Sequence, residues 1–211
     1  MFSVQCLERA PSSIVPAVLL VAACASGCAT SVLPTDYLAH ADAGRGGKMR
    51  VCWVDNGVEL SSYRNIAVRE FATDKAVGVK GKIDRPAWGR GIRDRLVLDL
   101  RRHGKNATHD PRILPGGRPF LLITGSIAQL NPGDPRKRYR IGFGAGRALV
   151  DIEAKLYRVE QGKAVLCAEF AESEAKSKGV VGDPTTLLDF CIRRISRTMA
   201  KYIAKHGKDK R

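Results

Sequence analysis

Three strand-like runs between Phe120 and Phe170 decide the fold of this chain. They read FLLITGSIAQL (120–130), IGFGAGRALVDIEAKLYRV (141–159) and AVLCAEF (164–170). In the middle run, apolar residues at the even positions from Ala148 to Leu156 alternate with Asp151, Glu153 and Lys155. A period of two places apolar side chains on one face of a strand and charges on the other. The pattern therefore predicts half-buried antiparallel strands whose charged face meets solvent.

Short turns and two amphipathic helices complete the predicted fold. Gln161–Gly162 is a hairpin signal between the second and third runs. A helix from about Pro86 to His103 has Asp84 as its cap, and a second helix begins at Pro184. Their apolar stripes are Trp88, Ile92, Leu96, Val97 and Leu100, and Leu188, Cys191, Ile192, Ile195, Met199 and Ile203.

Three further strands are expected before the central runs. They are a short edge strand or docked extension at Val51–Val54, a core strand at Ser61–Phe71, and a weak strand around Ala107–His109. Strands followed by a helix, more strands and a last helix favour an α+β fold. The sequence predicts a mostly antiparallel sheet with helices packed on one face, in a single domain that follows a signal peptide and a tether.

The N-terminus is typical of a bacterial lipoprotein leader. An apolar core from Ile14 to Ala23 is too short to span a bilayer, and it ends in the lipobox-like sequence LVAAC at Cys24. Cys28 is the second choice for lipidation, and an ordinary signal peptide cleaved near Ala25 is the alternative. The predicted parts are a signal peptide (1–23), a flexible tether (24–50), one α+β domain (51–207) and a basic tail (208–211).

The chain is strongly basic. It has 36 Lys and Arg residues against 21 Asp and Glu residues, a formal net charge of +15. Such an excess suits nucleic acid, an anionic membrane surface or acidic glycans. Export makes nucleic acid an unexpected partner, and Ala25 after Cys24 is not the aspartate that retains lipoproteins in the inner membrane. We therefore expect the protein on the periplasmic face of the outer membrane, held by its lipid, with an anionic envelope component or another envelope protein as partner.

One connection carries the densest charge, and glycines follow it. Arg136, Lys137, Arg138 and Arg140 are candidates for partner binding, and a solvated loop in a basic protein is the alternative interpretation. The glycines Gly142, Gly144 and Gly146 resemble a nucleotide-binding sequence, but a strand follows them where a dinucleotide site needs a helix. They are interpreted as structural glycines at a bulge or bend.

The cysteines match no zinc pattern, and we expect no metal and no cofactor. Cys167 lies on a predicted strand and Cys191 on the apolar stripe of the last helix. A disulfide between them is one alternative in an oxidising periplasm. Two buried thiols that act as small apolar groups are the other, which the sequence favours.

The same central residues resemble a known family. Gly125–Leu130, Pro132-Gly133, Arg138–Gly146, the alternating strand to Val159 and Gly162 are similar to bacterial lipoproteins with domain of unknown function 4410, over about residues 60–205. Leu33–Tyr37 and Leu60–Tyr63 resemble a second uncharacterised lipoprotein family. Neither resemblance implies a known reaction or assigns a catalytic residue.

Two functions from different classes remain. The first is a non-catalytic envelope lipoprotein that binds its partner through a basic surface, and it is favoured because the sequence contains no recognisable catalytic motif. The alternative is a periplasmic enzyme acting on an acidic glycan or lipid, since catalytic groups can meet from distant segments.

Overall fold

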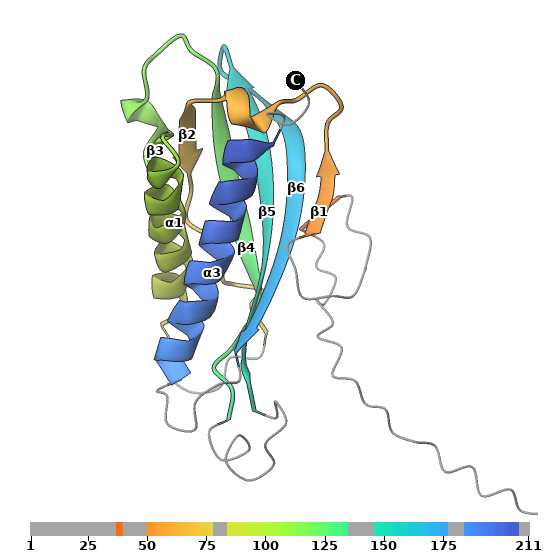
Figure 1. Ribbon diagram of the computed structural model, residues 1–211, viewed down its shortest axis with the longest axis vertical. Helices are drawn as coiled ribbons and strands as arrows, with labels where there is room; N and C mark the ends of the chain where they lie inside the picture. The colour runs from red at the N-terminus through yellow and green to blue at the C-terminus, as the bar shows by residue number, and fades with distance from the viewer. Residues whose placement is uncertain (1–36, 40–49, 78–83, 135–145, 177–183, 207–211) are drawn as a thin grey trace, which may run out of the picture.

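Six strands form one twisted sheet in the order β1–β6–β5–β4–β2–β3 (Figure 1). The computed structural model describes residues 37–39, 50–77, 84–134, 146–176 and 184–206. The strands are β1 (Arg50–Val54), β2 (Asn65–Val68), β3 (Asn106–Thr108), β4 (Phe120–Asn131), β5 (Ala148–Glu160) and β6 (Lys163–Lys176). The expected core strand at Ser61–Phe71 is shorter than predicted, because a 3-10 helix occupies Leu60–Ser62.

Antiparallel pairing joins β4, β5, β6 and β1, and parallel pairing joins β2 to both β3 and β4. The hairpin between β5 and β6 turns at Gln161 and Gly162, which have φ values of 48° and 77°. Two successive left-handed residues are the signature of a type I′ turn, whose twist matches that of the flanking strands. The mostly antiparallel sheet predicted from the alternation is thus confirmed.

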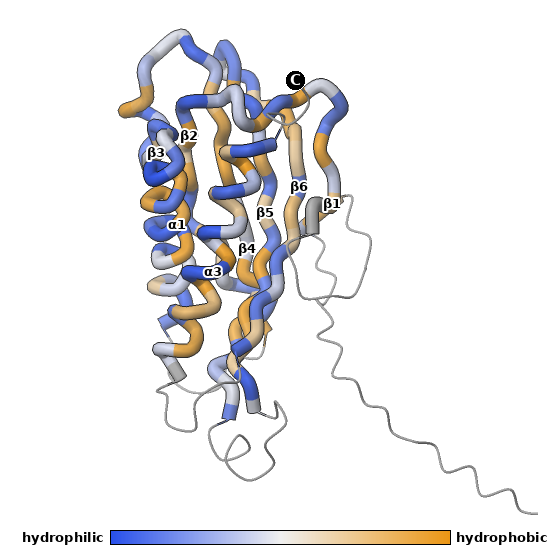
Figure 2. The backbone as a smooth tube through the Cα atoms, in the orientation of Figure 1, coloured by the Kyte–Doolittle hydropathy of each residue, from blue (hydrophilic) through white to orange (hydrophobic). Residues whose placement is uncertain are grey.

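Two helices, α1 (Arg85–Arg102) and α3 (Pro184–Lys205), lie side by side on one face of the sheet (Figure 1). Asp84 caps α1 by accepting a hydrogen bond from the backbone N–H of Ala87 at 3.1 Å. Both predicted apolar stripes face inward, and Figure 2 shows hydrophobic and hydrophilic residues alternating along each helix. Of the stripe residues only Trp88 stays partly exposed at the edge of the core.

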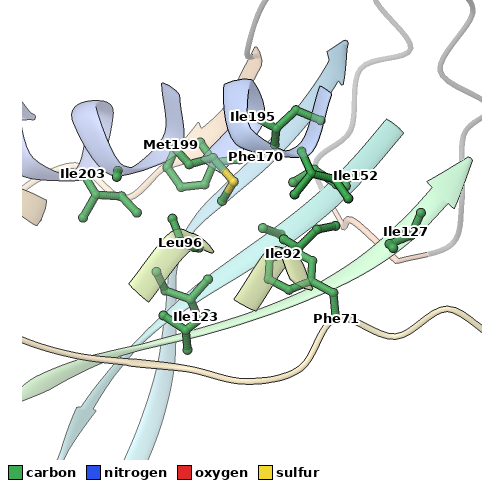
Figure 3. Packing of buried hydrophobic residues seen from close by; sticks show 14 of the residues in the cluster. Phe71, Ile92, Leu96, Ile123, Ile127, Ile152, Phe170, Ile195, Met199 and Ile203 are labelled. Atoms are coloured by element: carbon green, nitrogen blue, oxygen red, sulfur yellow. The ribbon is translucent and has the colours of Figure 1, made fainter. Parts of the chain in front are cut away.

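Phe71 is part of the hydrophobic core between the helices and the sheet (Figure 3). The Phe71 side chain is 1% exposed. Its ring lies against Gly125 of β4 and its carbonyl against Gly89 of α1, so closely that a Cβ at either glycine would come within about 2.2 Å of Phe71. Phe71 can pack this closely against β4 and α1 because Gly125 and Gly89 carry no side chain.

The other face of the sheet differs from the prediction. Asp151 and Glu153 were expected in solvent, but they are 0% and 1% exposed, and Glu169 of β6 is 0% exposed. Residues of the expected tether explain part of this burial. Tyr37 donates to or accepts from the Thr124 hydroxyl at 2.9 Å, and the backbone N–H of Ala39 donates to the Glu169 carboxylate at 3.0 Å. Residues 37–39 therefore lie on the sheet and belong to the folded domain.

Candidate functional site

Most residues proposed as sites from the sequence lie outside the part of the chain that the structure describes. These are Cys24, Cys28, Arg136, Lys137, Arg138, Arg140, Gly142 and Gly144. Gly146 is described, has φ 67°, and accepts a hydrogen bond from the Asp134 N–H at 3.0 Å. A Cβ at Gly133 would lie 2.3 Å from the Gly146 carbonyl oxygen. The backbone just after β4 therefore lies close to the backbone just before β5.

Cys167 and Cys191 are free, buried thiols in the structure, with no bond between them. Cys167 Sγ donates to the Leu156 carbonyl at 3.3 Å. Burial raises the pKa of the Cys167 thiol to about 11 and that of Cys191 to about 12. Since the thiolate is the nucleophile and metal ligand, both residues act as small apolar groups.

A basic surface lies at the end of the sheet where β2 begins and α1 ends, at the top of Figure 1. Two adjoining hollows of about 510 and about 410 Å³ share Arg64, Asn65 and Arg118. We call them together the basic hollow. Its other lining residues are Ser62, Tyr63, Arg101, Gly104, Lys105, Asn106, Pro115, Pro119, Arg158 and Glu160.

Local structure fixes the floor of the basic hollow. Gly104, with φ 76°, ends α1 and turns the chain so that Lys105 points back under the 3-10 helix. The Lys105 ammonium donates to the carbonyls of Ser61 and Tyr63 at 2.6 and 2.9 Å. Arg101 Nε donates to the Ala107 carbonyl at 2.8 Å. These contacts hold two cations in fixed positions.

The paired asparagines of β2 and β3 form the centre of the hollow. Asn65 and Asn106 are register partners in the parallel ladder, and Asn106 Nδ2 donates to Asn65 Oδ1 at 3.0 Å. Asn65 is buried, whereas Asn106 is exposed. An amide edge is therefore presented among the cations.

Arg64 and Arg118 carry the uncompensated charge. Both are exposed, and neither has a carboxylate partner among residues 37–39, 50–77, 84–134, 146–176 and 184–206. Arginines on the helices differ, because Arg95 pairs with Asp189 at 3.3 Å and Arg194 with Glu174 at 3.4 Å. Two guanidinium groups without partners beside two fixed cations favour binding of an anion.

The lining of the basic hollow includes one tyrosine, Tyr63, and one carboxylate, Glu160. Burial raises the pKa of Tyr63, against the lowering effect of the neighbouring Arg158. Within the described ranges no three His, Cys, Asp or Glu residues cluster as metal ligands. The described helices include none that is long and apolar enough to cross a bilayer.

The covered face of the sheet is a second feature that sequence reasoning missed. Lys155 lies 3.8 Å from the Glu169 carboxylate, and its ammonium sits 5.1 Å from the centre of the Tyr37 ring. Ser173 donates to Asp151 at 2.5 Å. Tyr37 thus covers a polar layer on β4, β5 and β6. Its position at the end of the sequence resemblance at Leu33–Tyr37 was the one available signal.

We expect Tyr37→Ala to lower the free energy of unfolding by about 2 kcal/mol, because it removes a half-buried aromatic ring and a hydrogen bond. Tyr37→Phe keeps the ring over Lys155 and should lower stability by only about 1 kcal/mol. Thermal melting of the two variants measures the difference. Wild-type stability in both would show that the Tyr37 segment does not contribute to the fold.

The structure thus defines a single-domain α+β protein with a basic hollow at one sheet end. The model of the family described as "Domain of unknown function (DUF4410)" matches residues 66–181. The chain belongs to this family, as the residues around Gly142–Gly146 predicted. No curated protein matches the sequence.

Several solved structures are similar in fold. The PelC dodecamer from Paraburkholderia phytofirmans is 10% identical, with 72% of this chain and 98% of that chain covered and a TM-score of 0.46. A DUF330 protein from Xanthomonas campestris is 14% identical, with 76% and 94% covered and a TM-score of 0.45. A minor lipoprotein from Acinetobacter baumannii is 12% identical, with 67% and 93% covered and a TM-score of 0.38. At such identities no activity carries over.

Proposed function

We propose that this protein is a non-catalytic lipoprotein of the bacterial envelope, anchored to the periplasmic face of the outer membrane through acylated Cys24. It binds an anionic envelope partner through its basic surface. The observation that carries this proposal is the basic hollow, in which Arg64 and Arg118 have no carboxylate partner within the described chain. The apolar leader that ends at Cys24 supports export from the cytoplasm and attachment to the membrane.

The basic hollow supports binding over catalysis. Its one lysine and four arginines outnumber its one carboxylate, Glu160, and both Lys105 and Arg101 donate to backbone carbonyls. Such groups attract and orient an anion, but general acid–base chemistry needs a group that titrates near the working pH. The two buried cysteines with raised pKa are also unsuited to nucleophilic attack. A periplasmic enzyme acting on an acidic glycan or lipid is the competing class.

Basic residues precede and follow β4 in the sequence. The basic hollow includes Arg118, two residues before β4 begins, and the basic segment Arg136–Arg140 follows the end of β4 at Asn131. Binding of an anionic partner to the basic hollow should weaken as salt screens the charges.

Cys24→Ala tests the anchor. We expect it to move the protein from the outer-membrane fraction to the soluble periplasmic fraction and to remove the acyl mass, because no other anchor is proposed. Cys28→Ala is the matched control and should leave both fractionation and mass unchanged. Membrane fractionation measures where each variant is located, and intact-mass spectrometry measures whether it carries the acyl mass. A Cys24→Ala protein that stays in the membrane with unchanged mass would contradict the lipid anchor.

A further inference from the structure

We propose that the basic hollow is a binding site for a carboxylate-bearing glycan strand. This inference rests on the proposed envelope function and names the partner class of its basic surface. The site consists of the two adjoining hollows around Arg64, Asn65 and Arg118.

The shape suits a chain-like ligand. Hollows of about 510 and about 410 Å³ share the lining residues Arg64, Asn65 and Arg118. Each alone lies in the roughly 300–1,000 Å³ range of small-molecule sites. A third hollow of about 370 Å³ continues from Arg118 and Glu160 to the β5–β6 turn at Gly162. Each of the three hollows shares lining residues with the next. Consecutive units of a linear polymer can therefore occupy consecutive hollows.

Charge placement favours carboxylates on that polymer. The planar guanidinium groups of Arg64 and Arg118 offer paired N–H donors that match a carboxylate. Arg158 lies on the second hollow beside Tyr63, and Lys105 and Arg101 lie on the first. Glu160 is the single acidic residue among those lining the two hollows. The field along the path is therefore positive.

Neutral groups between the cations suit sugar rings and hydroxyls. Asn106 uses one amide N–H on Asn65 and is exposed, so its carbonyl and second N–H face the hollow's polar surroundings. Ser62 lines the second hollow and donates its hydroxyl to the Glu59 carbonyl at 2.7 Å, and the half-buried ring of Tyr63 gives an apolar surface on which a sugar ring can stack. A simple phosphate site would not need these amide, hydroxyl and aromatic groups.

The concave form also argues against a membrane surface as the occupant. A bilayer is nearly flat at this scale, and charged side chains reach it best from a convex face. The protein has such a face on α3, where Arg197, Lys201 and Lys205 are exposed. The cations of the basic hollow line a concave surface, which suits a strand better than a flat bilayer.

The test uses the full chain in non-ionic detergent and polygalacturonate as the probe, with neutral dextran as the negative ligand. Arg64→Gln/Arg118→Gln removes the two unpartnered charges, and Arg197→Gln/Lys201→Gln removes the same charge from the exposed face of α3. We expect the first variant to bind polygalacturonate about 10- to 100-fold more weakly and the second to bind within about threefold of wild type. Thermal melting checks that both variants fold, and Arg158→Gln gives an independent, smaller loss.

Each other outcome overturns the proposal. Equal losses in the two double variants would show that polygalacturonate senses only net charge. Binding of phosphatidylglycerol vesicles that depends on Arg64 and Arg118, without binding of polygalacturonate, would identify a lipid headgroup as the ligand. Polygalacturonate binding is measured in solution and membrane attachment in cells. Loss of the glycan site and loss of the Cys24 anchor are therefore distinguishable.

Discussion

Replacing Gly125 by alanine should lower the free energy of unfolding by about 3 kcal/mol, a loss of roughly 10 °C in melting temperature. The new Cβ would lie 2.0 Å from Cε1 and 2.2 Å from Cδ1 of the Phe71 ring. Carbon atoms in contact prefer about 3.5–4.0 Å. The ring has little room to move, because Phe71 is 1% exposed and its backbone N–H donates a hydrogen bond to the Gly89 carbonyl of α1 at 3.4 Å.

Gly91→Ala is the matched control for Gly125→Ala. Gly91 lies in α1, and a Cβ added there would meet no atom within 4 Å outside the neighbouring turns of its own helix. Alanine at this position should therefore stabilise the helix by about 0.5–1 kcal/mol. Adding Phe71→Leu to Gly125→Ala should recover part of the loss, because the smaller side chain makes room. Chemical denaturation measures all four proteins. Equal stability of the Gly91 and Gly125 variants would refute the close approach of β4 and Phe71.

Local sequence patterns predicted both helices and the β5–β6 turn, whereas β2 is shorter than the predicted strand at Ser61–Phe71. Asp84 and Pro86 predicted the start of α1 within one residue, and Gln161–Gly162 predicted the β5–β6 turn. These signals act over a few residues, through capping, fixed φ and left-handed conformations. The apolar stripes predicted which helix faces are buried for the same reason.

Contacts between distant segments could not be predicted. The alternation in β5 indicated a solvent-facing side for Asp151 and Glu153, yet Tyr37 reaches the same side of the sheet from 87 residues away in sequence, at Thr124. The basic hollow likewise combines Arg64 and Arg118, which occupy separate loops and no shared motif. Charge density along the chain pointed to Arg136–Arg140 because it measures neighbours in sequence, whereas a surface site depends on neighbours in space.

Glu172 makes the stability of the protein depend on pH. It is 4% exposed and pairs in register with Ile152, so it faces the core side of the sheet that α3 covers. Its Oε2 atom has no hydrogen-bond partner among the described residues. Burial, with a smaller contribution from Glu174, raises the pKa of Glu172 to about 8, against the lowering effect of Arg194. The folded protein therefore holds a neutral Glu172 at neutral pH.

The sign of the effect follows from proton binding. Between pH 4.5 and about 8 the unfolded chain has lost the Glu172 proton while the folded protein keeps it, so rising pH favours unfolding. Glu172→Gln removes this dependence and is nearly the same size. We expect the stability of the variant relative to wild type to increase by about 2 kcal/mol between pH 5 and pH 7, and to level off above about pH 8.

Paired denaturation curves at pH 5, 6, 7 and 8 measure this difference directly. Other groups titrate in both proteins, so their contributions cancel when the two are compared at each pH. Glu70→Gln provides the baseline, since Glu70 is an exposed carboxylate 3.7 Å from Arg90. A constant difference between Glu172→Gln and wild type across this range would mean that Glu172 is ionised in the folded protein. The β6–α3 interface would then have to be more open to water than the burial of Glu172 indicates.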